Sequence, residues 1–160
     1  MSSDFAGFWL RAIAYIIDYI ILQLTQSLAV MPLLGLLGFE FSETPELDWS
    51  TLGEAQSISQ LNSFYAEMAP LLVLGMTISL LYYSLMESSK HQGTIGKMAV
   101  GIKVTDLNGI RLNLGLAIIR NVSKIFSALF LMIGYIMAGL TSKKQGLHDM
   151  IANTIVIKKN

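Results

Sequence analysis

Cysteine is absent from this 160-residue sequence, histidine occurs only twice, and just 14% of the residues are charged. The lack of cysteine excludes disulfides, thiol nucleophiles and cysteine-ligated zinc, and it leaves the redox compartment open. Two histidines are too few for a histidine-rich metal site, so we expect neither a metal nor another cofactor. The charged fraction lies below the quarter or so that is usual in soluble domains. The net charge is zero and no strongly basic patch is present, which argues against nucleic-acid binding.

Long apolar stretches take the place of charge. Three occur, Phe8–Val30, Ala66–Met86 and Ile118–Leu140, with 23, 21 and 23 residues. About 20 apolar residues cross the hydrocarbon core of a bilayer as a helix. We therefore predict an all-α integral membrane protein, a single domain with three membrane-embedded helices. The expected helices cover residues 8–30, 66–87 and 117–140. Arg11 and Asp18 interrupt the first stretch, so we expect it to remain as a helix rather than to be a cleaved signal peptide.

The charges are distributed unevenly along the sequence. Six acids and no Lys or Arg lie between Met31 and Glu67, whereas ten of the eleven basic residues lie at or after Lys90. Because basic loops stay in the cytoplasm, we predict a cytoplasmic N-terminus, an external acidic loop and a cytoplasmic second loop. The expected loops are 31–65 and 90–116, and a basic tail follows at 141–160. The third helix either crosses the membrane and puts this tail outside, or dips in and returns; the sequence leaves both open.

The second loop carries a β signal. Ile102–Thr105 and Ile110–Leu112 alternate apolar with polar residues, and the Asn108-Gly109 pair between them is a strong turn signal. We predict a small cytoplasmic β-hairpin, because an open two-stranded ribbon could not satisfy its backbone groups in lipid. Thr154–Ile157 is also β-prone and could supply a third strand.

Asp18 is the most informative single residue. It lies about 15 Å into the first helix by helical rise, where a carboxylate costs about 2.5 to 3.5 kcal/mol. Such a residue is expected to be paired, hydrated, protonated or used in function. Arg11 lies seven residues earlier, on nearly the same face of the helix. The two side chains could meet through Tyr15 or through water, and Arg11 could also reach the headgroups.

Two main explanations of Asp18 stay open, beside a contact with lipid headgroups. In the structural one it locks helices together by bonding Arg120, Lys124, or the hydroxyl of Tyr82 or Tyr83. In the functional one it is a proton or cation site. Each explanation predicts a buried and partnered carboxylate, so the sequence does not separate them.

Arg120 and Lys124 are four residues apart and form one basic stripe on the third helix. The simpler interpretation is an interfacial helix that lies on anionic lipid headgroups. The alternative is that one of these two residues is the counter-ion of Asp18.

Two short motifs suggest catalysis without supporting it. His148-Asp149 are adjacent and therefore do not share a helix face. Gly93–Lys97 lacks the spacing of a phosphate loop and is better explained as a glycine turn before a short surface helix. No set of nucleophile, base and acid is present, so we predict that the chain is not an enzyme.

The order of these features resembles the RDD family, which is named after one arginine and two aspartates. The stretches that carry the resemblance are 6–11 with Asp18, 92–97, 101–104, Leu114-Gly115, Arg120-Asn121 and 145–149. On this match Arg11 and Asp18 are the family's arginine and first aspartate. Asp149 is the preferred second aspartate, and Asp106 is the rival.

The resemblance implies a small multi-pass protein of the bacterial inner, or plasma, membrane. It also implies two functional hypotheses. One is ion or solute transport, such as cation/proton exchange, through Asp18. The other is a non-enzymatic structural or assembly module that binds lipid or a partner membrane protein. Three helices enclose little polar space, so we expect a homo-oligomer or a complex with a partner.

Overall fold

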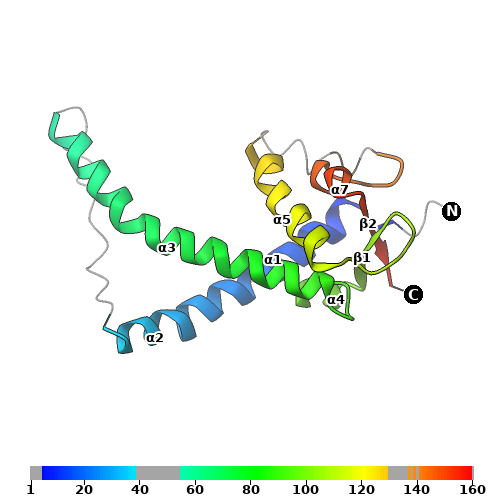
Figure 1. Ribbon diagram of the computed structural model, residues 1–160, viewed down its shortest axis with the longest axis horizontal. Coiled ribbons are helices and arrows are strands. Elements are labelled where there is room, and N and C mark those ends of the chain that lie inside the picture. The colour runs from blue at the N-terminus through cyan, green and yellow to red at the C-terminus, as the bar shows by residue number, and fades with distance from the viewer. Residues whose placement is uncertain (1–4, 39–54, 130–136, 138, 140, 160) are drawn as a thin grey trace. The chain divides into compact units, whose positions relative to one another are not determined.

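The structure is a computed structural model that describes residues 5–38, 55–129, 137, 139 and 141–159 (Figure 1). The chain divides into two compact units, which are described separately. The first unit comprises Met1–Leu22 and Ser79–Asn160, and the second comprises Gln23–Ile78. The described residues are mostly helical, with one small antiparallel sheet.

Among the described residues, two continuous helices are long and apolar enough to cross a membrane. The first runs over Phe8–Leu36, from α1 (Phe8–Thr25) through a π-helical turn, η1 (Gln26–Val30), into α2 (Met31–Leu36). The second, Leu61–Ser88, lies within α3 (Ala55–Ser88). The first two predicted membrane helices are thereby supported, although both extend into the predicted external loop.

The third predicted membrane helix is not confirmed. Its described part is α5 (Leu114–Leu129), which has 16 residues and is not one of the two candidate spans. Most of the remainder, residues 130–136, 138 and 140, lies outside the described residues. The central part of the acidic loop, residues 39–54, also lies outside them.

The second unit brings η1 close to α3. A Cβ atom added to Gly75 would lie 3.5 Å from Oε1 of Gln26, so the glycine lets this amide approach the backbone of α3. Small residues that allow such close approach are typical of contacts between membrane helices.

In the first unit, α1 buries its small and polar face and exposes its apolar face. Ala14, Asp18 and Leu22, each four residues apart, are buried. Large apolar side chains such as Trp9 and Ile16 are exposed. This pattern is the reverse of a soluble amphipathic helix and is the one expected where lipid surrounds the helix.

The sheet pairs β1 (Ile102–Asp106) with β2 (Thr154–Lys158). Val104 faces Val156 in the register, and Phe5 adds an isolated bridge to Ile157. The buried apolar core beside it consists of Ala6, Ala14, Ile102, Val104, Leu112, Ala117 and Val156. The sheet therefore joins the N-terminal residues, the second loop and the C-terminal residues.

The predicted hairpin is wrong, because β1 pairs with a different strand from the one predicted. Residues 110–112 form no strand; instead Asp106 closes the turn by accepting hydrogen bonds from the backbone N–H groups of Asn108, at 2.9 Å, and Ile110, at 2.7 Å. The β-prone C-terminal segment, predicted only as an additional strand, pairs with β1. This segment pairs with β1 in place of residues 110–112 because its first three residues, Thr154 to Val156, are all buried, whereas Ile110 and Arg111 stay exposed.

Two short helices complete the first unit. α4 (Ile95–Ala99) follows the glycine turn, where the sequence predicts a short surface helix, but its residues Gly96 and Lys97 are buried. α7 (Leu147–Ile151) precedes β2. α7 packs against α5, and α4 packs against β1.

Candidate functional site

Asp18 is on α1, and its buried carboxylate lies against the end of α3 and the start of α4. Its Oδ1 accepts hydrogen bonds from the Tyr82 hydroxyl, at 2.8 Å, and from the backbone N–H of Gly96, at 2.7 Å. Its Oδ2 accepts one from the Thr94 hydroxyl at 2.5 Å. We call these four residues the Asp18 cluster. All three donors are neutral.

Gly96 makes this cluster possible. A Cβ atom at this position would lie 2.1 Å from the carbonyl oxygen of Ala14 and 2.9 Å from Cγ of Asp18. Only glycine allows the first turn of α4 to lie against α1 this closely. Thr94 caps the helix by accepting a hydrogen bond from the backbone N–H of Lys97 at 3.4 Å.

A second set of buried charges is centred on Glu87, at the end of α3. Arg120 donates from Nη1 to both carboxylate oxygens of Glu87, at 2.7 and 2.8 Å. Lys97 forms an ion pair with the same carboxylate, and Lys124 lies 3.8 Å from it. Asn121 adds a hydrogen bond at 3.2 Å. A single carboxylate thus faces three cations.

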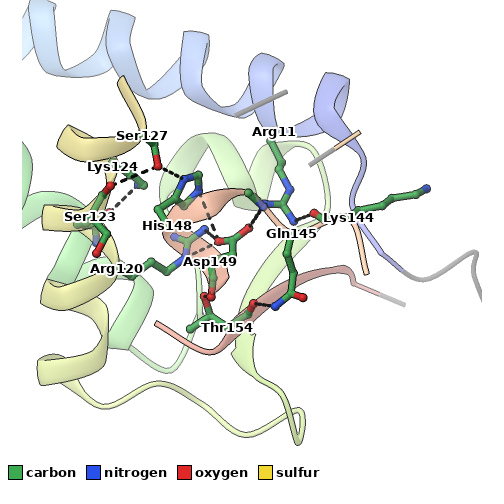
Figure 2. Close-up of polar contacts among 12 residues, drawn as sticks. Arg11, Arg120, Ser123, Lys124, Ser127, Lys144, Gln145, His148, Asp149 and Thr154 are labelled. Carbon is green, nitrogen blue, oxygen red and sulfur yellow. Dashed lines mark hydrogen bonds and ion pairs between the residues drawn. The ribbon is translucent and has the colours of Figure 1, made fainter. Parts of the chain in front are cut away.

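Asp149, on α7, continues this set of contacts (Figure 2). Its Oδ1 accepts from Nε and Nη2 of Arg120, at 2.9 and 2.7 Å, and its Oδ2 forms an ion pair with Arg11. Arg11 is held further by the carbonyl oxygens of Ala6, at 3.0 Å, and Lys144, at 2.6 Å. The members of this ion network are Arg11, Glu87, Lys97, Arg120, Lys124 and Asp149.

Burial and charge act in opposite directions on these groups. Burial favours a raised pKa for Asp149, but the charges of Arg120 and Arg11 outweigh it and hold that pKa well below its usual range. Burial lowers the pKa of Lys97, and the nearby Glu87 opposes the shift. Asp149 therefore stays ionised, and its negative charge is balanced by two guanidinium groups.

His148 gives a pH prediction. Burial lowers its pKa to about 3, whereas an unfolded histidine titrates near about 6.5. Unfolding therefore takes up a proton below that value, and the free energy of unfolding should fall with decreasing pH by up to about 1.4 kcal/mol per unit. We expect His148→Gln to flatten the dependence between pH 6.5 and 5 in detergent unfolding curves. An unchanged slope would show that His148 is protonated in the folded state.

The structure changes the partners predicted for the site residues. The predicted pairing of Arg11 with Asp18 is wrong, because Arg11 binds Asp149. Tyr15 does not bridge them; it is exposed and stacks on Tyr19, with ring centroids 6.5 Å apart. Of the partners left open for Asp18, the structure shows the hydroxyl of Tyr82.

The basic stripe of α5 also differs from its prediction. Arg120 is 2% exposed and points into the protein, where it binds Glu87 and Asp149 rather than lipid or Asp18. Lys124 lies beside Asn121, at 2.5 Å, and over the Tyr83 ring, 4.4 Å from its centroid. The stripe faces the inside of the first unit, with Arg120 buried and Lys124 partly buried.

Sequence reasoning missed Glu87 and Lys97. Glu87 stands at the end of an apolar stretch, which is a usual place for a surface charge, and nothing local shows that it is buried. Lys97 follows the glycine turn, and the signal that could have indicated its role is the short helix begun by Thr94. Asp106, the rival of Asp149, lies outside the ion network and caps its own turn.

These features define a helical membrane protein in which an arginine and two aspartates are buried in polar clusters. The chain belongs to the RDD family, whose model matches residues 5–153. It is 35% identical over 162 residues to "Uncharacterized protein YxaI" of Bacillus subtilis (strain 168), covering 96% of this chain and 97% of the relative. It is 28% identical over 159 residues to "Uncharacterized membrane protein YteJ" of the same organism, covering 98% and 83%. No solved structure matches the chain significantly. The predicted family is thereby confirmed.

Proposed function

We propose that this membrane protein transports a monovalent cation or a proton, with Asp18 as the group that binds and releases it. The observation that carries this proposal is the contrast among the three acids that are buried in the described part of the chain. Glu87 and Asp149 each contact two or more basic side chains. The described contacts of Asp18 are with neutral donors. An incoming cation could therefore replace a donor at Asp18 without breaking an ion pair.

The same proposal includes the topology. We place the chain in the inner membrane as a multi-pass protein with a cytoplasmic N-terminus and the segment 117–140 as a third embedded helix. The polar side chains of α5 support the third helix, because Arg120, Asn121, Ser123 and Ser127 are buried. Its exposed side chains are aliphatic, as on a lipid-facing helix. We further propose a homo-oligomer, since three helices enclose little room for a pathway.

Transport is tested by flux across proteoliposomes. We expect the parent protein to exchange protons for sodium, potassium or lithium, read with a pH-sensitive dye, and Asp18→Asn to lose this flux. The variant keeps the size of the side chain, so equal insertion and equal oligomer size should be obtained. Asp106→Asn is the matched control, because this aspartate lies outside both buried clusters. Flux that survives in Asp18→Asn would exclude Asp18 as the site.

The alternative is a non-enzymatic structural or assembly module, and the ion network favours it. The network joins α1, α3, α5 and α7 through buried ion pairs. In this case the first unit would offer a fixed surface to anionic headgroups or to a partner membrane protein. Exposed lysines such as Lys143 and Lys158 suit such a contact. This alternative predicts that Asp18→Asn impairs assembly, and that neither protein moves ions.

A further inference from the structure

The Asp18 cluster and the ion network are connected through α4. The first turn of α4 holds Asp18 through Thr94 and Gly96, and the next residue, Lys97, is clamped on Glu87. From Glu87 the contacts continue through the ion network to Arg11, which lies on α1 like Asp18. The connected residues, in order, are Asp18, Gly96, Lys97, Glu87, Arg120, Asp149 and Arg11. Asp18 and Arg11, the two ends of this series of contacts, are seven residues or about 10 Å apart along α1.

α4 has little stability of its own. It contains five residues, and isolated helices of this length do not form in water, because one turn does not repay its nucleation cost. Its position must therefore come from tertiary contacts. It packs against β1, and the backbone N–H of Ile95 donates to the Tyr82 hydroxyl at 3.1 Å. Two further contacts, which we call its anchors, tie it to buried charges: the carboxylate of Asp18 at its first turn and the ion pair between Lys97 and Glu87.

Lys97 has an uncommon environment for a lysine. Its side chain is 9% exposed, and its ammonium group lies against the carboxylate of Glu87 and 5.9 Å from the centroid of the Tyr83 ring. Lysines are rarely buried unless they are paired. Breaking this pair would leave a buried carboxylate facing one fewer cation, which would move α4 before it moved the long helices.

We propose that Lys97 is a positioning residue for the Asp18 cluster and that it acts through α4. When Lys97 holds Glu87, the hydroxyl of Thr94 and the N–H of Gly96 stay directed at Asp18. A cation that replaces these donors would free the first turn of α4 and weaken the hold of Lys97 on Glu87. By linkage, weakening the Lys97 pair changes the affinity of Asp18 for its ligand by the same factor. The role in ligand binding rests on the proposed function; the mechanical connection of the two anchors does not.

The connection is tested by hydrogen–deuterium exchange of the full chain in nanodiscs. We expect the amides of residues 96–100 to exchange about tenfold faster or more in Asp18→Asn and in Lys97→Met. The double variant should exchange no faster than the faster single variant, because either change already frees α4. Lys97→Arg should keep most of the protection. Lys90→Met is the matched control, because it removes an exposed lysine from the same loop.

Two results would overturn the proposal. One is protection of α4 that is unchanged in Lys97→Met, and the other is a rise of similar size in α1, α5 and the sheet, which would make Lys97 a general stabiliser. Should Lys97→Met fail to insert, Lys97→Gln removes the same charge with a polar side chain and is read in the same way.

Flux provides the second readout. In proteoliposomes that exchange protons for sodium, Lys97→Met should change the sodium concentration for half-maximal flux severalfold and leave the maximal flux within about twofold. Lys97→Arg should restore the parent value. If the parent protein moves no ion, the transport proposal fails, whereas the exchange experiment still decides whether α4 connects the two anchors.

Discussion

Gly96→Ala is expected to destabilise the first unit by about 3 kcal/mol, at the upper end of the usual cost of overpacking. The added Cβ would lie 2.1 Å from the carbonyl oxygen of Ala14, which is backbone and cannot turn away. α4 would have to leave α1, and Asp18 would lose the hydrogen bonds from Thr94 and Gly96. The loss is measured from unfolding curves in mixed micelles titrated with sodium dodecyl sulfate.

Gly115→Ala is the matched control for this change. Gly115 also lies in a helix, α5, but a Cβ there would meet only Oδ1 of Asn113, at 3.4 Å. Alanine is favoured over glycine inside a helix by about 1 kcal/mol, so we expect this variant to be as stable as the parent or more stable. Equal losses in the two variants would mean that the close approach of α4 to α1 is not what requires Gly96.

Arg120→Met is expected to cost about 3 to 5 kcal/mol, the range for removing one partner of a buried ion pair. Arg120 is the only residue of the ion network that binds both of its acids, Glu87 and Asp149, among the described residues. Without it both carboxylates stay buried, Glu87 loses its guanidinium partner and keeps Lys97, and Asp149 keeps only Arg11. The same micelle titration measures the loss, and Arg111→Met, at an exposed position, should cost little.

A second change separates lost charge from lost packing. Glu87→Gln combined with Arg120→Met removes one of the two stranded charges, so the double variant should recover part of the stability lost in Arg120→Met. If the double variant is less stable than Arg120→Met by the full effect of Glu87→Gln alone, the two residues act independently and the ion pair contributes little.

The first two membrane helices and the need of Asp18 for partners could be predicted because they depend on local composition. A run of apolar residues predicts a span wherever it occurs, and an acid inside such a run needs an explanation. Tyr82 could be named among four candidate partners of Asp18 for the same reason, since few polar groups are present in the apolar stretches. The helix α4 could be predicted from the glycine turn that precedes it in the sequence.

The partners of the charges could not be predicted. Arg11 and Asp149 are 138 positions apart, and spacing on one helix suggested Asp18 in place of Asp149. The hairpin failed in the same way, because a local turn signal at Asn108-Gly109 competed with a distant strand that buries more of its side chains. Both errors arise where a local pattern competes with tertiary burial, which usually decides strand pairing.

The first unit is held together by contacts between segments from the two ends of the sequence, and this has a consequence for synthesis in the cell. Phe5 pairs with Ile157, and Arg11 with Asp149, so these contacts must wait until the ribosome has reached residue 157. At common translation rates the wait is on the order of ten seconds after residue 11 is made. During that time Arg11 lacks its carboxylate partner while both long helices can already enter the bilayer. Insertion would thus precede the completion of the ion network. A nascent chain that stalls before α7 would leave Arg11 without Asp149 and Arg120 with Glu87 alone, and would be open to proteolysis.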